Sequence, residues 1–273
     1  MKEVSILKYH HSGRDNLNEK RHFHDSEFEI LHILSGTGTM MIKDKLYSIS
    51  PNTIFFICGN DAHCSMPDKP SAYIRNKINF SKELLLTVSE HFNCNNITEE
   101  LFAQGGSAVK LSLDSSLKID EYFLKMSETI HEKNGIASLK LFTDIFSVMD
   151  IVISDSKKSV PFVKNKISDV IEYINKNIDQ KLTLDDIAQD TKISKYYLCH
   201  SFCEAVGMTV FEYIEFLRIA KAKQLLAETN NSISEIASAV GYNSCAYFGK
   251  IFKKRENITP KQYKIRNENI RSV

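Results

Sequence analysis

The chain has 273 residues, enough for one large domain or two ordinary ones, and 42% hydrophobic with 25% charged residues is typical of a globular protein. No apolar run approaches 18 residues, which excludes a membrane-spanning helix. The six cysteines show neither a CxxC pair nor zinc-finger spacing. With no signal peptide, we expect a cytoplasmic protein with free thiols and no membrane partner.

The formal net charge is only +1, but it is unevenly distributed. Residues 163–273 hold 17 basic and 13 acidic residues, a net of +4, so the remainder has a net of −3. Between Lys250 and Arg271 there are eight basic and two acidic residues. A solvated helix face is the simpler explanation of such a run, and a nucleic-acid contact is the alternative.

Residues 1–80 have the pattern of β-structure. Short runs rich in β-branched and aromatic residues alternate there with turn signals, and many short strands at near-regular spacing favour a sandwich or a barrel. The expected strands are Val4–Tyr9, Phe28–Leu34, Thr39–Lys43, Leu46–Ile49, Thr53–Ile57 and Ala72–Phe80.

Residues 81–155 change to a helical period. We expect a helix after Ser81 and two longer helices over 114–133 and 136–154, which are also the expected dimer element. The last helix has an apolar stripe, which is usually core, with a dimer seam as the alternative. The stripe consists of Phe142, Ile145, Phe146, Met149, Val152 and Ile153. Residues 156–164 are polar, contain Pro161 and interrupt the periodicity, so they are the expected linker between domains 1–155 and 165–273.

The C-terminal part contains two similar helix-turn-helix patterns. Ile233, Ile236, Ala237 and Val240 lie at the spacing of one buried helix face, and Gly241 stands where that helix would end. An equivalent pattern precedes it, with one residue fewer in its turn. The predicted units are 184–203 and 233–254, joined by a helix over 210–226.

At these residues the sequence resembles the AraC/XylS family of bacterial transcription regulators. The resemblance is carried by IAxxxxISxxYLxxxFxxxxG over 187–207 and by IAxxVGYxxxxYFxxxFKKxxxITPxxY over 236–263. It implies an α+β two-domain fold, in which an N-terminal cupin-like β-barrel followed by helices precedes an all-α domain with two helix-turn-helix units. Two departures are Lys192 and Asn257, where family members usually have Gly; Asn tolerates the left-handed conformation, so we expect the turn to survive.

In the family, outward residues of the two recognition helices touch DNA. The resemblance assigns Lys250 to a base, because Lys commonly binds guanine O6 and N7, and assigns Lys253 and Lys254 to phosphates. The complete expected DNA-binding set is Lys195, Tyr196, Cys199, His200, Ala246, Gly249, Lys250, Lys253 and Lys254.

The front half carries the pattern HxHx4Ex6G, from His22 to Gly36, which resembles the first cupin motif. With the later His63, four residues could converge in a barrel and form an effector pocket. They are His22, His24, Glu29 and His63. The same four side chains are candidate ligands for a divalent metal, which is the alternative to hydrogen bonding with a small molecule.

Together these features predict a DNA-binding transcription regulator, an activator rather than an enzyme, with no required cofactor. The expected partners are double-stranded promoter DNA, a small-molecule effector, RNA polymerase and a second copy of the chain. A sugar effector fits the family's habits. The alternative is a metal-dependent cupin enzyme, or a metal or redox sensor, fused to a DNA-binding domain.

Overall fold

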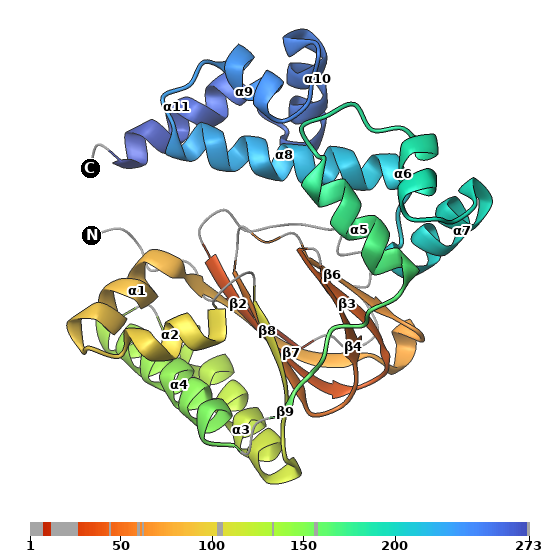
Figure 1. Cartoon of the computed structure of the whole chain (residues 1–273). Coiled ribbons are helices and arrows are strands. Elements are labelled where there is room, and N and C mark those ends of the chain that lie inside the picture. The colour runs from red at the N-terminus through yellow and green to blue at the C-terminus, as the bar shows by residue number, and fades with distance from the viewer. Residues whose placement is uncertain are drawn as a thin grey trace. The chain divides into compact units, whose positions relative to one another are not determined.

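The computed structural model describes residues 8–11, 27–43, 45–58, 61, 63–102, 106–132, 134–155 and 158–271. The chain forms two compact units, Met1–Val163 and Lys164–Val273. The first consists of β-sheets followed by helices and the second is all helical (Figure 1). The predicted α+β fold class is therefore confirmed.

The first unit is built on two antiparallel sheets. The six-stranded sheet has the order β1-β7-β2-β5-β8-β9 and the three-stranded sheet has the order β4-β3-β6. The strands are β1 Lys8–His11, β2 Glu27–Ser35, β3 Gly38–Ile42, β4 Lys45–Ile49, β5 Thr53–Cys58, β6 His63–Pro67, β7 Ile74–Ser81, β8 Ser107–Lys110 and β9 Lys158–Ser159. Of the expected strand at Val4–Tyr9, residues 4–7 lie outside the described residues.

The central strands of the large sheet are buried on both faces. From β2, Leu31 and Ile33 pack with residues of β3 and β4 between the two sheets, whereas Phe28 and Ile30 pack against the helices. Alternate residues of a strand point to opposite faces, so each strand feeds two hydrophobic cores. This explains why β5 has the continuous apolar sequence TIFFIC rather than an alternating one.

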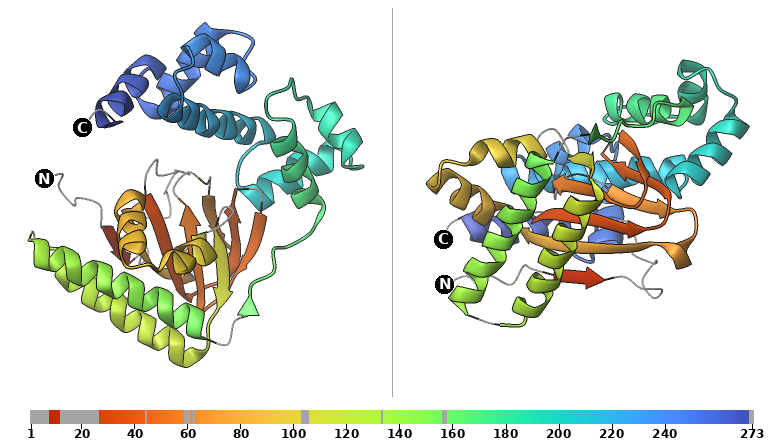
Figure 2. Two further views of the ribbon diagram at one scale, coloured as in Figure 1. Left: turned by 60° about the vertical axis from the view of Figure 1, so that its left-hand side comes forward. Right: turned by 90° about the horizontal axis from the view of Figure 1, so that it is seen from below.

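Four α-helices cover the outer face of the large sheet. They are α1 Lys82–His91, α2 Asn95–Phe102, α3 Leu113–Thr129 and α4 Gly135–Ser154, and a short 3-10 helix, η1, covers Pro70–Ala72. Figure 2 shows α3 and α4 running side by side beneath the sheet. The apolar stripe of α4 packs into this core, with Phe142, Ile145, Met149 and Val152 all buried. Its alternative interpretation as a dimer seam is wrong, because the sheet and α3 already cover it.

Part of the stretch expected to be a linker pairs with the first unit. Lys158 and Ser159 form β9 beside β8, and Phe162 makes a β-bridge with Tyr47. The Val163 amide also donates to the Leu46 carbonyl. Residues 158–163 therefore belong to the β-structure rather than to a free connection. None of the helices in the described part of the chain has both the length and the apolar character needed to cross a membrane.

The second unit contains α5 Lys166–Lys176, α6 Leu184–Asp190, α7 Lys195–Val206, α8 Val210–Glu228, α9 Ile233–Ala239, α10 Cys245–Glu256 and α11 Pro260–Arg271. Local side chains start these helices. The hydroxyl of Thr183 accepts from the Asp186 amide at 3.2 Å, and that of Ser194 accepts from the Tyr197 amide at 3.1 Å. Each satisfies a backbone donor that the helix itself leaves free.

The two helix-turn-helix units, α6–α7 and α9–α10, have turns of the same construction. Lys192 and Gly241 both adopt positive φ, at 54° and 88°. The next amide then bonds back five residues, from Ile193 to the Ala188 carbonyl and from Tyr242 to the Ala237 carbonyl. Lys192 thus adopts the left-handed conformation that Gly241 adopts in the second helix-turn-helix unit. Asn257, with φ of 62°, ends α10 in the left-handed region, as expected.

Candidate nucleic-acid interface and a buried polar cluster

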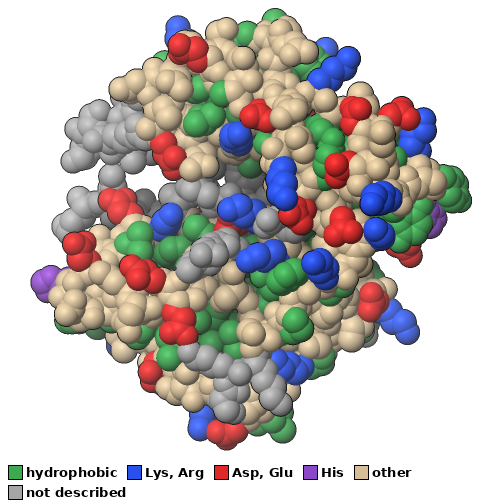
Figure 3. All heavy atoms as spheres, in the orientation of Figure 1, with side chains coloured by type: hydrophobic (Ala, Val, Ile, Leu, Met, Phe, Trp, Pro, Cys, Tyr) green, Lys and Arg blue, Asp and Glu red, His purple; other side chains and the backbone are tan. Residues whose placement is uncertain are grey.

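The first candidate site is the outward face of α7. Leu198, Phe202 and Val206 are buried at helical spacing and hold one side of this helix against its unit. The other side carries the first set of residues expected to touch DNA, and all of them are exposed. They are Lys195, Tyr196, Cys199 and His200. Figure 3 shows hydrophobic and histidine side chains together over this part of the surface.

Tyr196 is the most exposed large side chain of this face. It is 81% exposed, and its ring stacks on His200 with centroids 6.1 Å apart and an interplanar angle of 17°. Lys195 pairs with Asp185 at 2.9 Å, and both side chains are exposed. An exposed pair of this kind contributes less than about 1 kcal/mol, so Lys195 can exchange Asp185 for a phosphate at little cost.

The second candidate face lies on α10. Phe248, Ile251 and Phe252 are buried, and the outward residues expected from the sequence are exposed, except that Gly249 is half-buried. Apart from its chain neighbours and the backbone of α10 itself, no atom of the described residues lies within 4 Å of where a Cβ of Gly249 would be. The fold therefore does not require a glycine here, and its backbone is open to close approach. The exposed residues are Ala246, Lys250, Lys253 and Lys254.

Arg255, which follows two lysines in the basic run, contacts α8. Its guanidinium donates to the Glu212 carbonyl at 3.2 Å and lies 3.5 Å from the Glu215 carboxylate, both on α8. An ion pair between the buried Lys223 and the half-buried Glu256, at 2.8 Å, adds a second connection. These contacts dock α10 on α8, so the run 253–255 divides between outward cations and a structural one.

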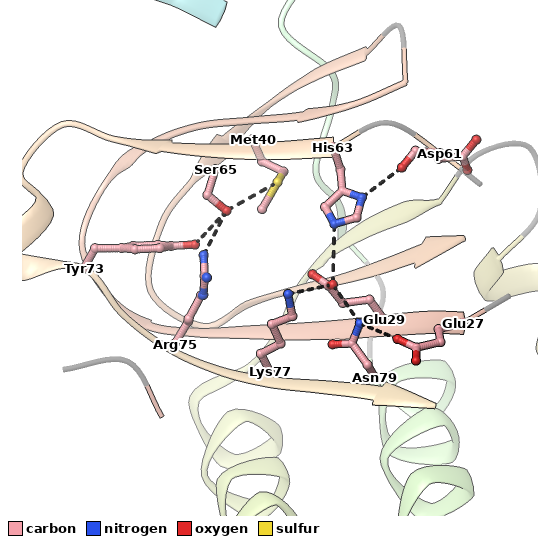
Figure 4. Close-up of polar contacts among 10 residues, drawn as sticks. All are labelled: Glu27, Glu29, Met40, Asp61, His63, Ser65, Tyr73, Arg75, Lys77 and Asn79. Carbon is pink, nitrogen blue, oxygen red and sulfur yellow. Dashed lines mark hydrogen bonds and ion pairs between the residues drawn. The ribbon is translucent and has the colours of Figure 1, made fainter. Parts of the chain in front are cut away.

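The second candidate site is a polar cluster between the two sheets of the first unit (Figure 4). The Glu29 carboxylate, on β2, receives three groups at its Oε2: Lys77 Nζ at 3.0 Å, Asn79 Nδ2 at 3.3 Å and His63 Nε2 at 3.4 Å. All four residues are less than 9% exposed. We name these four residues the Glu29 cluster.

The environment of His63 favours its charged form. Burial opposes protonation, but the negative charge of Glu29 and the hydrogen bond from Nδ1 to the Asp61 carbonyl, at 2.9 Å, outweigh it. The pKa of His63 is therefore raised above its usual value of 6.5, although Lys77 acts against this. The cluster offers positive donors beside one carboxylate.

A second polar group continues along the same face. Tyr73 and Arg75 precede Lys77 and Asn79 at alternate positions, so their side chains share the interior side of the sheet. The Tyr73 hydroxyl and Arg75 Nη1 both donate to Ser65 Oγ, at 3.2 and 3.3 Å. Sequence reasoning missed these residues and Lys77 and Asn79. The available signal was the placing of Arg75, Lys77 and Asn79 at alternate positions of one expected strand.

Two of the four residues expected in the effector pocket come together and two cannot be assessed. Glu29 and His63 are adjacent, whereas His22 and His24 lie outside the described residues. Within the described part of the chain, no three His, Cys, Asp or Glu side chains gather in a way that could hold a metal ion. A cation bound at Glu29 would also compete with the ammonium of Lys77.

Comparison with known families matches both units. Residues 187–266 match the family described as "Helix-turn-helix domain", and residues 7–91 match the family described as "AraC-like ligand binding domain". The AarP transcriptional activator of Providencia stuartii is 36% identical over 113 residues, which cover 41% of this chain and 84% of AarP.

Two further relatives match over a smaller share of their length. The bifunctional transcriptional activator and DNA repair enzyme AdaA of Bacillus subtilis is 38% identical over 95 residues, 35% of this chain and 45% of AdaA. The lactose operon transcription activator of Staphylococcus xylosus is 27% identical over 165 residues, 60% of this chain and 53% of that protein. The chain thus spans about half the length of these two relatives.

Proposed function

Because the chain belongs to the AraC family of transcription regulators, we propose that it activates transcription by binding promoter DNA through α7 and α10, in response to a small molecule bound between its two sheets. The observation that carries this proposal is the pair of helix-turn-helix units in one compact unit, each with a buried inner face and an exposed outer one. A recognition helix of this kind fits the major groove of DNA.

The two outward faces support different contributions to DNA binding. The α7 face is the more varied in chemistry, with a cation, a ring stack and a thiol. The α10 face has small residues around Lys250, followed by two exposed lysines suited to phosphates. Base contacts determine sequence preference, whereas phosphate contacts add affinity that depends on salt. We therefore assign most of the sequence preference to α7.

The test is selection of bound duplexes from random DNA, followed by affinity measurements at several salt concentrations. Lys250→Ala is expected to relax the preference at one base pair by about tenfold. Lys253→Ala is the matched control, expected to weaken all sequences alike and to lower the salt slope by about one. Tyr196→Ala and His200→Ala are expected to shift the preference over a wider part of the site. Binding that is neither sequence-dependent nor salt-dependent would overturn the proposal.

The Glu29 cluster supports an effector with several hydroxyl groups. Its carboxylate accepts and its ammonium donates, which suits groups that do both. Among the described residues nothing donates to Asn79 Oδ1, although Asn79 is only 2% exposed. A buried acceptor of this kind is costly unless a ligand or water donates to it. The name of the Staphylococcus relative refers to lactose, and a sugar is the class we propose here.

A panel of mono- and disaccharides tests this part, with thermal unfolding and calorimetry as readouts. Asn79→Leu removes the acceptor and is expected to weaken sugar binding about tenfold. Ser48→Ala, an exposed residue of β4, is the matched control and should bind normally. If no sugar stabilises the wild-type protein, the assignment of this effector class is wrong. The proposed DNA binding is tested separately, by the selection experiment.

We further propose that two copies associate through α3, and that the DNA-bound dimer contacts RNA polymerase. Leu113, Leu117 and Leu124 are 65%, 59% and 54% exposed and lie on one side of α3 at spacings of four and seven. We name these three residues the α3 leucine stripe. Such spacing suits packing against a second helix of the same kind. A dimer would also present four helix-turn-helix units to one promoter.

A further inference from the structure

Arg218 lies near the middle of α8, the helix that joins the two helix-turn-helix units. Its Nε donates to the Ile178 carbonyl at 2.9 Å, and its Nη2 donates to the Gln180 carbonyl at 2.6 Å. Both carbonyls belong to the segment between α5 and α6, immediately before the first helix-turn-helix unit. The fork of the guanidinium is therefore fixed to the backbone on that side of the molecule.

The other side of the same guanidinium contacts the second helix-turn-helix unit, α9–α10. The Tyr242 ring, 7% exposed, lies 5.5 Å from the guanidinium carbon of Arg218. A Cβ added at the neighbouring Gly241 would lie 2.8 Å from Arg218 Nη2 and 2.8 Å from the Ile178 carbonyl oxygen. The turn between α9 and α10 therefore approaches the backbone after α5 so closely that only a glycine fits.

These contacts form a connection in parallel with α8. Without them, the two helix-turn-helix units would be linked by α8 and by the residues of each unit that pack on α8. Through Arg218, the segment before α6 and the turn before α10 meet directly. We name the contact of Arg218 with Ile178, Gln180, Gly241 and Tyr242 the Arg218 clamp.

We infer that Arg218 is a positioning residue that fixes the separation and orientation of α7 and α10, and thereby sets the spacing between the two DNA segments that one chain binds. The part of the inference that concerns DNA spacing rests on the proposed function, because it assumes that both helices contact DNA. The part that concerns the two helices describes the protein alone and can be tested without DNA.

The physical reason is preorganisation. When two binding modules are held in the geometry of the complex, the second contact is intramolecular and occurs at high effective concentration. If the modules can move, the entropy of ordering them is lost on binding. A lysine at 218 keeps the charge and the long stem but lacks the planar fork that reaches two carbonyls and lies against a ring. It is expected to restore only part of the effect.

The variant Arg218→Leu is expected to fold, because other contacts keep α10 on α8. The Lys223–Glu256 ion pair and the hydrogen bond from Arg255 to the Glu212 carbonyl do not involve Arg218. Thermal unfolding and circular dichroism establish this before any further measurement. If Arg218→Leu fails to fold, Arg218→Lys provides the same test with a smaller perturbation.

The chain offers its own labelling sites for the first experiment. Cys199 on α7 and Cys245 at the start of α10 are both exposed. Spin labels at these two positions report the separation of the recognition helices in the full chain, once the other four cysteines are replaced by Ser. These are Cys58, Cys64, Cys94 and Cys203. Double electron–electron resonance then measures the distribution of distances.

We expect one narrow distribution for the protein with Arg218, a broader one for Arg218→Leu and an intermediate one for Arg218→Lys. Arg266→Leu, at an exposed arginine of α11, is the matched control and should leave the distribution unchanged. An unchanged distribution in Arg218→Leu would overturn the inference, whatever the protein does with DNA.

The second experiment measures affinity for the selected DNA site and for the same site with one or two base pairs inserted between the segments bound by α7 and α10. Each insertion moves the segments apart by about 3.4 Å and rotates them by about 35°. Arg218→Leu is expected to bind the unaltered site about tenfold more weakly, and to lose less than the wild type on insertion. Equal losses at every spacing would contradict the role in spacing. A wild-type protein without site preference would instead refute the proposed function, and the spin-label result would still decide the geometry.

Discussion

We expect His32 to make the stability of the first unit sensitive to mild acid. It lies on β2, faces α3 and is 0% exposed. Its Nε2 is 2.8 Å from Ser116 Oγ, and that hydroxyl donates to Asn52 Oδ1 at 3.0 Å. Ser116 therefore accepts from Nε2–H, which leaves the neutral ring with its free electron pair on Nδ1. Among the described residues Nδ1 has no hydrogen-bond partner, so protonation would bury a charged ring with one N–H that nothing accepts.

The size of the effect follows from the shift in pKa. Burial lowers the pKa of His32 from 6.5 to about 4, although the charge of Asp120 opposes this. Above pH 6.5 the ring is neutral in both the folded and the unfolded chain, and the full stability is present. As the pH falls from 6.5 towards 4, only the unfolded chain takes up the proton. At about 1.4 kcal/mol for each pH unit, the free energy of unfolding decreases by about 3 kcal/mol over this range.

The assay is urea unfolding of the full chain between pH 4 and 7.5, followed by circular dichroism, with the transition of the first unit fitted separately. His32→Gln removes the titration, so the wild type should lose about 3 kcal/mol more than this variant between pH 6.5 and 4. His131→Gln, at an exposed histidine, is the control and should lose stability as the wild type does. Parallel losses in the wild type and His32→Gln would refute the reasoning, as would a His32 pKa near 6.5 measured by NMR.

Three further predictions concern the Glu29 cluster and the α3 leucine stripe. Lys77→Met leaves a buried carboxylate without its ammonium and should cost about 3 kcal/mol in urea unfolding, with recovery in Lys77→Met/Glu29→Gln; no loss would contradict the pairing. Because the pKa of His63 is raised in the folded chain, the stabilisation from its charge is present below pH 6.5 and is lost as the pH rises through that raised pKa. His63→Gln should therefore destabilise the protein more at pH 5.5 than at pH 8, and the opposite order would refute this role of His63. Leu117→Asp should yield monomers in light scattering, while Leu86→Asp, an exposed leucine of α1, should not.

Most of the second unit could be predicted from the sequence because its structure is specified locally. The caps, the apolar spacings and the glycine of the turn all act within a few residues of one another. The spacing of Leu198 and Phe202 identifies the buried side of α7, and the outward side follows by exclusion. The extra residue in the second turn could also be read directly, and it is present in the structure, with four residues between α6 and α7 and five between α9 and α10.

The first unit was less predictable, because its strands depend on distant partners. The sequence HCSMP of β6 contains no β-branched residue and no Phe, Tyr or Trp, and it is held as a strand by its pairing with β3. The short strand β8 likewise depends on β5. Strand propensity is a property of the neighbours more than of the residues themselves. The apolar stripe of α4 had two possible covers, and only the packed sheet decided between them.

By itself, then, the sequence determined the fold class, the two helix-turn-helix units and their outward side chains, since residues close along the chain specify each of these. Tertiary structure alone decided which polar groups meet. The register of β2 against β7 places Asn79 opposite Glu29 and Lys77 opposite Leu31, fifty and forty-six residues away along the chain. Arg218 reaches the Ile178 carbonyl across forty residues. No local pattern records such a distance, because pairing between remote segments is set by the packing of the whole unit.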